Sequence, residues 1–467
     1  MIEARAEENL LQKRLREIVR EVEQTGASIG VLVQPMNLAS DQQPWFSHDA
    51  DKLFTPASNT KIVTVATALV RLGGDYRFKT EVAYTGELRD GILRGDLYVK
   101  GYGDPSLYTD ESFQAVAGVS LRNLVDAIRE KNIRQIDGNL YVDASFFDEQ
   151  RLGDGWAWDY ESEYYSAQTS ALSINRGTVQ LVYKPGVRSG EPVQLSLLPN
   201  TRYVHVLSEA KTVAAGEENT LEIIRLRGSN VIRVTGNLPV GEEGEKLVTV
   251  DEPALYLGTL LRESLEGAGV VLSPQSKVQN GAVPVNRTLI AELYSAPLRE
   301  IAKHLNKTSD NHYAEMLLKT LGAVCKGEGS AEAGVEVVRE VLQELGIAGM
   351  YQWRDGSGLS PYNLVSPRQL FTLLQAIASR PEYEDLVHSF PCAGVDGTLE
   401  NRLKDSPLYR RVFAKTGTLT SVSSLSGYAD LPDGERIIFS IMANRYPGET
   451  DYLKAQEDRI LQALAAL

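Results

Sequence analysis

Two residues in the first part of the chain, Ser58 and Lys61, could form a nucleophile and its base. A serine hydroxyl attacks poorly at neutral pH unless a base lies within hydrogen-bond reach. Lysine can be that base when burial or a second cation lowers its pKa. A spacing of three residues places both side chains on one face of a helix, and the N–H groups at the start of that helix can stabilise a developing oxyanion.

The helix that carries this pair is predicted from its composition. Ile62–Leu72 is apolar almost all round, which is typical of a helix buried inside a large core. Thr55 is expected to be its N-cap, and Pro56 suits the first helical position. Gly73 and Gly74 are expected to end it.

A second Ser-x-x-Lys motif provides an internal control. Ser208 and Lys211 have the same spacing, but they follow a strand-like run, Tyr203–Leu207, and precede no helical pattern. A motif needs its structural context, so this copy is interpreted as accidental. By the same rule, Ser58 and Lys61 need further support.

Two short motifs downstream supply that support. Ser309-Asp-Asn311 lies at a predicted break between two helices, where the serine could relay a proton and the asparagine amide could hold a peptide carbonyl. Lys415-Thr-Gly417 falls on a predicted strand, where the lysine would supply charge and the glycine would let a substrate backbone lie close. The three motifs in these contexts match the set found in penicillin-binding proteins and class A β-lactamases.

Composition limits the remaining possibilities. A chain of 467 residues exceeds one ordinary core, so two or three domains are expected. A net charge of −14 argues against a nucleic-acid partner, and no apolar run reaches the roughly 18 residues of a membrane span. The five histidines are scattered and Cys-x-x-Cys is absent, so no metal site is predicted. Cys325 and Cys392 are interpreted as two buried apolar side chains, and the sequence does not say whether they pair.

Periodicity indicates the elements around the motifs. Residues 412–417, 422–431 and 436–442 are predicted to be neighbouring antiparallel strands, and the last, being nearly all apolar, is expected to be central. Residues 1–25 and 451–467 carry amphipathic helix patterns. Between Gly74 and about residue 290 the chain is richer in short strands, which indicates a large insertion.

With these motifs, the chain resembles the low-molecular-mass class C penicillin-binding proteins, the D-alanyl-D-alanine carboxypeptidase/endopeptidases of the S13 peptidase family. The resemblance runs from about residue 27 to the end. Besides the three motifs it rests on four segments, Gly95–Leu107, Tyr165–Asn175, Asp355–Ser360 and Lys415–Leu419. One departure is Ser421, where the family usually has glycine, and it is expected to affect local strand geometry rather than chemistry.

The resemblance implies an α/β (α+β) fold. A β-lactamase/transpeptidase-like catalytic domain, an antiparallel sheet flanked by helices, would comprise residues 1–76 and 290–467. An insertion domain would comprise 77–180 and 250–289, and a nested strand-rich domain would comprise 181–249.

The resemblance also implies a mechanism that needs no cofactor. Ser58 would attack the D-Ala-D-Ala carbonyl of a peptidoglycan stem peptide while neutral Lys61 takes its proton. The N–H groups of Ser58 and Thr418 would form the oxyanion hole, and Ser309 would pass a proton to the leaving D-alanine. Water would then release the acyl-enzyme, and β-lactam antibiotics would act as covalent inhibitors.

The remaining site residues are expected to bind substrate. Asn311 would position the substrate amide. The terminal carboxylate would meet Lys415, Thr416 and Thr418, beside Gly417.

A second binding feature is expected in the insertion. In the resembling family a Trp, an Asp three later and a Tyr five after that bind the amino end of the diaminopimelyl side chain. The same spacing gives Trp156, Asp159 and Tyr164, and Leu419 would form the pocket floor. An ammonium group pairs favourably with a carboxylate, and its methylene stem packs favourably against aromatic rings. Alternatively, such aromatic residues commonly fill the seam between two domains.

Two other functions compete with this one. A serine β-lactamase-like hydrolase would need an efficient deacylation base, usually on a Glu-x-x-Leu-Asn loop, which this sequence lacks. A non-catalytic cell-wall-binding protein would not need all five motif residues intact: Ser58, Lys61, Ser309, Asn311 and Lys415. The balance between carboxypeptidase and endopeptidase activity and the oligomeric state are not encoded in these patterns.

Location follows only from the resemblance. The first 25 residues contain no apolar segment of the roughly 7–15 residues that a secretory signal needs. Either the protein stays in the cytoplasm or the chain starts after its export signal. Since the family is exported, we expect the periplasm or the cell-wall side of the membrane.

Overall fold

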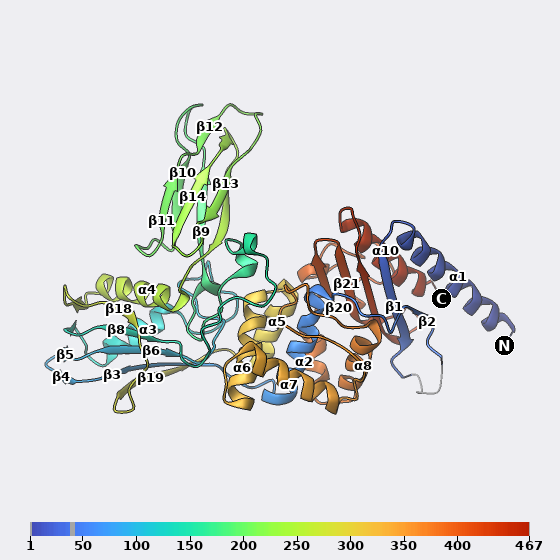
Figure 1. Cartoon of the computed structure of the whole chain (residues 1–467), viewed down its shortest axis with the longest axis horizontal. Helices are drawn as coiled ribbons and strands as arrows, with labels where there is room; N and C mark the ends of the chain where they lie inside the picture. Colours follow the sequence, from blue (N-terminus) through green and yellow to red (C-terminus); the bar gives the residue numbers. More distant parts are fainter. Residues whose placement is uncertain (1, 38–42, 467) are drawn as a thin grey trace. The chain divides into compact units, whose positions relative to one another are not determined.

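The computed structural model of the protein describes residues 2–37 and 43–466 (Figure 1). The chain divides into two compact units. The first comprises Met1–Tyr76, Gly153–Gly155 and Pro297–Leu467, and the second comprises Arg77–Leu152 and Trp156–Ala296. The finer division into three domains stays a prediction.

A five-stranded antiparallel sheet forms the centre of the first unit. Its strands are β2 (Phe46–His48), β1 (Ser28–Pro35), β22 (Arg436–Asn444), β21 (Val422–Asp430) and β20 (Val412–Leu419), in that spatial order. The prediction that the apolar strand is central is confirmed, because β22 lies in the middle and only its end residues are not buried. Strand β20 lies at one edge of the sheet. On its outer side Phe413 forms a β-bridge with Cys392, and among the described residues no strand pairs with residues 415–419 there.

Helices cover both faces of this sheet. They are α1 (Ile2–Glu23), α2 (Thr60–Leu72), α5 (Leu298–Thr308), α6 (Asn311–Lys326), α7 (Ala331–Glu344), α8 (Pro367–Ile377), α9 (Tyr383–Ser389) and α10 (Asp451–Leu464). The two predicted amphipathic helices, α1 and α10, lie side by side on one face (Figure 1), where Leu15 and Ile460 join Phe439 of β22 in one core. Helix α8 packs on the other face, and the turn before α2 contacts β20 and β21.

The start of α2 differs from the prediction. Ala57–Asn59 form a 3₁₀ turn, and the α-helix begins only at Thr60. Thr55 does not act as the N-cap, because its hydroxyl donates to the Pro361 carbonyl (3.3 Å) and its N–H donates to the Asn444 side chain (2.8 Å). The predicted cap was therefore wrong: contacts with distant segments hold Thr55 instead.

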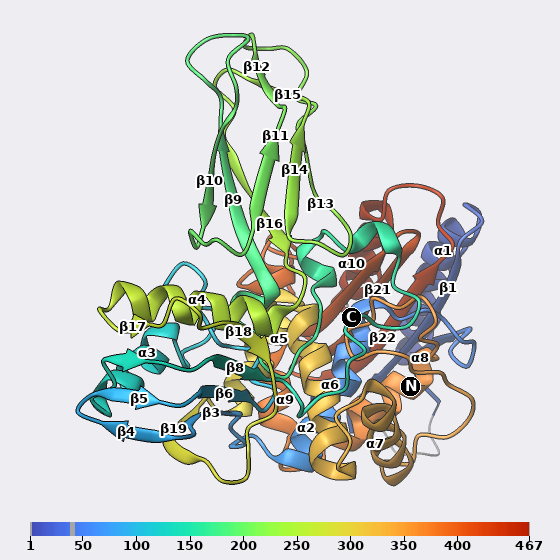
Figure 2. The same cartoon turned by 60° about the vertical axis from the view of Figure 1, so that its left-hand side comes forward.

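The second unit is built from short strands and two helices (Figure 2). One five-stranded sheet has the order β18 (Val278–Asn280), β8 (Leu140–Asp143), β6 (Leu97–Gly101), β3 (Lys79–Tyr84), β19 (Thr288–Tyr294), and a four-stranded sheet has the order β17 (Val271–Leu272), β7 (Gln135–Ile136), β5 (Ile92–Arg94), β4 (Glu87–Arg89). The helices are α3 (Leu121–Glu130) and α4 (Pro253–Gly267). The predicted strand-rich insertion thus begins within three residues of Gly74.

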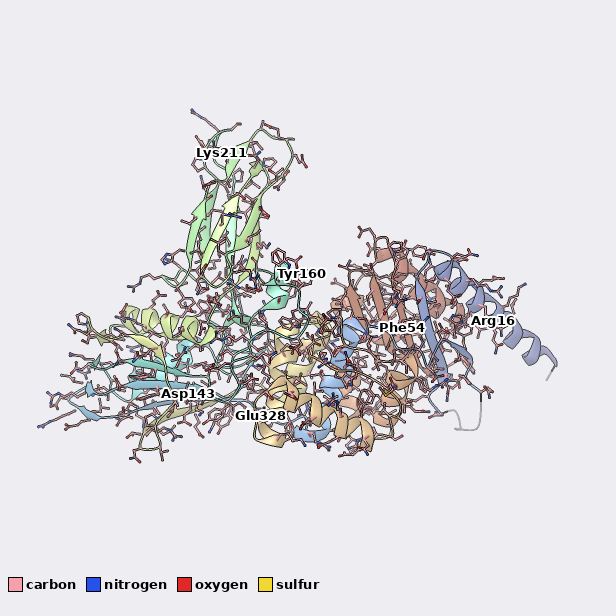
Figure 3. All side chains as sticks on the ribbon, in the orientation of Figure 1. Arg16, Phe54, Asp143, Tyr160, Lys211 and Glu328 are labelled. Carbon is pink, nitrogen blue, oxygen red and sulfur yellow. The ribbon has the colours of Figure 1, made fainter. Side chains whose placement is uncertain are left out.

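Residues 178–249 form three further small sheets. Their orders are β10 (Gln194–Leu198), β9 (Thr178–Lys184), β16 (Gly244–Thr249); then β11 (His205–Ser208), β14 (Val231–Thr235), β13 (Glu222–Arg225); and β12 (Lys211–Val213) with β15 (Asn237–Pro239). The second Ser-x-x-Lys motif lies here, because Ser208 ends β11. Lys211 begins β12 and is labelled in Figure 3. This copy therefore lies between two strands, as its interpretation as accidental requires.

The two cysteines do not form a disulfide. Cys325 and Cys392 are both free thiols. Cys325 is exposed, so the prediction of a buried side chain was wrong for it, because it lies in the last turn of α6 where the helix reaches the surface. Over the described residues, every helix is too short or too polar to cross a membrane.

Ser421 occupies a turn that favours glycine. Leu419 pairs with Val422, so Thr420 and Ser421 make a two-residue connection between β20 and β21. Ser421 has a φ of 64°, in the left-handed region that costs residues with a Cβ roughly 1–2 kcal/mol. The position where the resemblance leads us to expect glycine is thus the one position of this turn where glycine would remove strain.

Ser421→Gly is expected to raise the free energy of unfolding by about 0.5–1 kcal/mol, since relief of strain exceeds the greater entropy of the unfolded chain. The urea midpoint of unfolding measures this. Thr420→Gly is the matched control, because Thr420 lacks a positive φ and should lose stability. Equal effects of the two changes would rule out strain at Ser421.

Candidate active site

The 3₁₀ turn before α2 presents Ser58 at a strained point of the backbone. Ala57, directly before it, has a φ of 47°, a conformation that residues with a Cβ adopt at a cost and that tends to occur at functional sites. The loop at Gly358 lies so close that a Cβ there would approach the Ala57 carbonyl to 1.9 Å. Tight packing against a glycine therefore holds the turn.

Lys61 lies fully buried beneath Ser58 and has three partners. Its Nζ lies 2.9 Å from Ser58 Oγ, 2.6 Å from Asn311 Oδ1 and 2.7 Å from the Ser357 carbonyl. Charged, the ammonium can donate one N–H to each. The two carbonyl oxygens can only accept, so the proton that Lys61 can lose is the one that faces Ser58. The geometry thus directs the lone pair of a neutral Lys61 at the serine hydroxyl.

The environment makes the neutral form of Lys61 accessible. Burial lowers its pKa to about 8, although the negative charges of Asp355, Glu315 and Asp310 oppose this effect. An amine with a pKa near the working pH is suited to general base catalysis.

The break between α5 and α6 brings the second motif to the same place. Ser309 ends α5 in the left-handed conformation, with a φ of 59°, and Asp310 begins α6 by accepting a hydrogen bond from the Tyr313 N–H (3.1 Å). The predicted break is therefore present. Its consequence is that the two outer residues point at two lysines: Asn311 Oδ1 at Lys61, and Ser309 Oγ at Lys415 Nζ, 2.9 Å away.

Strand β20 supplies Lys415 from the other side. Lys415 is fully buried, and it donates to Ser309 Oγ and to the Thr416 carbonyl (2.8 Å). Burial and the nearby Lys61 hold the pKa of Lys415 well below its usual value. A positive charge on Lys61 therefore disfavours a positive charge on Lys415.

Gly417 brings the edge strand against Ser58. A Cβ at this position would lie 2.7 Å from the Pro56 carbonyl and 3.0 Å from the Ser58 nitrogen. Ser424, its partner on β21, donates to the same Pro56 carbonyl (2.7 Å). Only glycine lets β20 lie this close to the backbone N–H of Ser58.

The other site residues predicted on β20 line a cavity or are accessible to solvent. Thr416 Oγ1 bonds to Thr398 Oγ1 (2.7 Å), and Thr418 is exposed. Residues 416–418 line a cavity of about 300 Å³ together with Thr398, Arg402 and Lys454. Leu419 ends the strand and is half-buried. These positions are accessible along the edge where a peptide can add to the sheet.

The residues predicted in the insertion belong to the second unit. Asp159 lies in a 3₁₀ turn at Trp158–Tyr160 and is exposed, and Tyr164 begins another 3₁₀ turn with its ring 5.5 Å from that of Tyr165. The structure therefore brings together the five motif residues of the first unit, and it leaves Trp156, Asp159 and Tyr164 as a prediction. Within the described ranges, no cluster of His, Cys, Asp and Glu could hold a metal ion.

A buried carboxylate beside this site, Glu315, belongs to none of the three sequence motifs. Glu315 lies on α6 four residues after Asn311, hence on the same helix face, and it is only 3% exposed. It accepts hydrogen bonds from Gly356 and Ser357, in a segment whose role the resemblance left open. The spacing from Asn311 was the one signal that could have identified Glu315.

Known proteins are similar to this chain in both sequence and fold. The family model of the D-Ala-D-Ala carboxypeptidase 3 (S13) family matches residues 11–467. The chain is 38% identical over 459 residues to the D-alanyl-D-alanine carboxypeptidase of Actinomadura sp. (strain R39), and this alignment covers 94% of the chain and 81% of the relative.

Solved structures agree with these matches. The crystal structure of penicillin binding protein 4 from Haemophilus influenzae matches with a TM-score of 0.84 at 26% identity, covering 96% of this chain and 99% of that chain. The same protein complexed with a novel β-lactam matches with a TM-score of 0.78 at 25% identity and the same coverage. The predicted fold class and family are therefore confirmed: the chain belongs to the D-Ala-D-Ala carboxypeptidase 3 (S13) family.

Proposed function

We propose that this protein is a serine D-Ala-D-Ala carboxypeptidase/endopeptidase that cleaves peptidoglycan stem peptides through an acyl-enzyme on Ser58. The observation that carries the proposal is the set of contacts around Lys61. Two carbonyl oxygens and the Ser58 hydroxyl surround its Nζ, which is the arrangement a serine needs to lose its proton to a lysine.

Acylation then follows from the positions of these groups. Ser58 Oγ forms a bond to the carbonyl carbon of the penultimate D-alanine, and its proton moves to Lys61. The N–H groups of Ser58 and Thr418 hold the oxyanion, because Gly417 allows β20 to lie against the Ser58 turn. The C–N bond breaks, and the leaving nitrogen takes a proton from Ser309. Water later attacks the ester and gives its proton through Ser309 to Lys415, and the Ser58 oxygen leaves with the proton that Lys61 holds.

Lys415 has two tasks in this scheme. Its contact with Ser309 Oγ makes it the group that restores the proton of Ser309. Its charge attracts the terminal carboxylate of the substrate, which Thr416 and Thr418 also bind. An incoming carboxylate opposes the effects that lower the pKa of Lys415, so substrate binding favours a charged Lys415 beside a neutral Lys61.

Two measurements on the purified protein test this proposal. Labelling with a fluorescent penicillin, followed by mass spectrometry of the labelled peptide, should place the adduct on Ser58. Incubation with a stem pentapeptide should release D-alanine, and a cross-linked dimer separates endopeptidase from carboxypeptidase activity. A protein that neither forms an adduct nor releases D-alanine would contradict the proposal.

The proposal extends to location and partners. The substrate lies outside the cytoplasmic membrane, so we propose that the native protein is exported to the periplasm or the cell-wall side of the membrane. β-lactams are expected to be covalent inhibitors, as the complex of the Haemophilus influenzae relative supports. Cell fractionation of the native, untagged protein tests export, and a wholly cytosolic protein would contradict it.

We further propose that Asp159 binds the free amine of the stem peptide, with Trp156 and Tyr164 beside the methylene stem and Leu419 as the floor. Asp159→Ala should then lower kcat/KM for a peptide with that amine by about 10-fold or more, the effect of losing a charge-assisted contact. The same peptide with an acetylated amine is the control, and its kcat/KM should hardly change.

Acylation by a small penicillin without the amine should likewise be unaffected by Asp159→Ala. If rates with all three compounds fell in parallel, Asp159 would be structural. If no rate fell, the amine would bind elsewhere.

A further inference from the structure

A buried carboxylate holds the peptide that faces Lys61. Both oxygens of Glu315 accept from the Gly356 N–H (3.0 and 3.2 Å), and Oε1 also accepts from the Ser357 N–H (2.7 Å). Hydrogen bonds from backbone N–H groups to a carboxylate are strong and directional. Glu315 thereby sets the orientation of the Gly356–Ser357 segment from its place on α6.

The rest of the loop is held just as tightly. Asp355 accepts from the N–H groups of Gly358 (2.9 Å) and Ser360 (2.6 Å) and from Asn363 Nδ2 (2.6 Å). Thr64 Oγ1 donates to the Gly356 carbonyl (2.7 Å). Hydrogen bonds to the carboxylates of Glu315 and Asp355, and from Thr64 of α2, therefore restrain the conformation of the loop.

That conformation points the Ser357 carbonyl at Lys61 Nζ, 2.7 Å away. The carbonyl is one of the two acceptors that decide which hydrogens Lys61 retains. Without it, a neutral Lys61 could turn an N–H, rather than its lone pair, toward Ser58. The proton transfer that begins acylation would then lose its geometry.

We propose that Glu315 is a positioning residue of the acylation step: by fixing the Ser357 carbonyl it aims the proton-accepting face of Lys61 at Ser58. The inference rests on the proposed function, since it assigns Glu315 a part in the reaction of Ser58 and Lys61. The hydrogen bonds of Glu315 run to Gly356 and Ser357, so it acts on Lys61 through that segment.

The negative charge of Glu315 should also affect the pH dependence of acylation. Burial lowers the pKa of Lys61, and the negative charges of Asp355, Glu315 and Asp310 oppose this effect, while Lys415 is the neighbouring cation. Burial, together with the charge of Asp355, raises the pKa of Glu315, and the hydrogen bonds from Ser357 and Gly356 favour its charged form. Acylation needs neutral Lys61 and should increase with pH through the pKa of Lys61. Loss of the Glu315 charge lowers that pKa, and the acid limb of the profile moves to lower pH.

The test measures the second-order rate constant of acylation by a fluorescent penicillin across neutral and alkaline pH. Glu315→Gln should lower the plateau by about 10–100-fold, since the amide offers one acceptor where the carboxylate offers two and misplaces the carbonyl. The acid limb of the Glu315→Gln profile should lie at lower pH than the acid limb of the wild-type profile. Glu315→Asp keeps the negative charge, but its side chain is about 1.5 Å shorter. The rate constant at the plateau should therefore fall, while the acid limb should shift less than it does in Glu315→Gln.

Glu457→Gln is the matched control. Glu457 is another buried carboxylate of the same unit, 1% exposed, which accepts from Ser423 Oγ (2.7 Å) and Arg402 (3.0 Å). Its loss should lower thermal stability without moving the acid limb. This control separates general destabilisation from an effect on Lys61.

Three outcomes would overturn the inference. The first is a pH profile of acylation for Glu315→Gln that equals the wild-type profile. The second is a Glu315→Gln profile with a lower plateau but an acid limb at the wild-type pH, which would make Glu315 merely structural. A Glu315→Asp variant as active as the wild type would exclude positioning. Failure of the wild-type protein itself to be acylated would instead contradict the proposed function, and this inference with it.

Discussion

Ser58→Ala is expected to abolish covalent labelling by a fluorescent penicillin and to lower D-alanine release on the order of 10⁴-fold or more. The hydroxyl is the only group of the site from which the acyl-enzyme can form in the proposed mechanism. Lys61 would remain in place, because the Asn311 and Ser357 oxygens still accept its two other hydrogens. The variant should therefore fold and bind penicillin reversibly without forming an ester.

The chain contains its own control for this experiment. Ser208 has a lysine at the same spacing, but it ends strand β11, is exposed and accepts only a weak bond from the Ala210 N–H (3.3 Å). Ser208→Ala should label like the wild-type protein. Labelling that survived Ser58→Ala would show that another residue is the nucleophile, and the mechanism would be wrong.

Local patterns in the sequence were sufficient for the elements that carry the motifs. The apolar run Ile62–Leu72 identified α2, because a helix that is buried on all sides is apolar on all its faces. The apolar strand at the C-terminal end was correctly placed at the centre of the sheet for the same reason. The break at Ser309 followed from the turn-forming residues between two helical patterns.

The precise geometry of the site depends on contacts that no local pattern contains. The Ser357 carbonyl reaches Lys61 across 296 residues of sequence, and its loop is shaped by Glu315 and Asp355. The 3₁₀ turn at Ala57 exists because Thr55 is held by Pro361 and Asn444 instead of capping the helix. Such long-range packing overrides local propensity, and it is where the prediction failed.

Strain is likewise invisible in the sequence. Ala57 and Ser421 are ordinary residues, yet both adopt left-handed conformations, one beside Ser58 and one just after β20. A folded core must hold such residues against their preference. For Ser421 the one pointer in the sequence was the expectation, taken from the resemblance, of glycine at this position.

The second large effect is expected at Lys61. Lys61→Arg should reduce the rate of acylation by about 10³-fold or more, nearly as much as Lys61→Ala, because loss of a general base typically costs 10²–10⁴-fold. A guanidinium group keeps its proton at any pH at which the protein is folded, so it can donate to Asn311 and Ser357 but cannot accept from Ser58. A positive charge alone would therefore not rescue the reaction.

Stopped-flow acylation by a chromogenic β-lactam, measured across pH, distinguishes a base from a fixed charge. The wild-type rate should rise as Lys61 loses its proton, around a pKa of about 8. The Lys61→Arg rate should stay low and flat over the same range. Lys211→Arg, in the exposed second copy of the motif, is the matched control and should follow the wild-type curve. If Lys61→Arg retained substantial acylation, the charge of this residue rather than its basicity would matter, and another group would have to take the Ser58 proton.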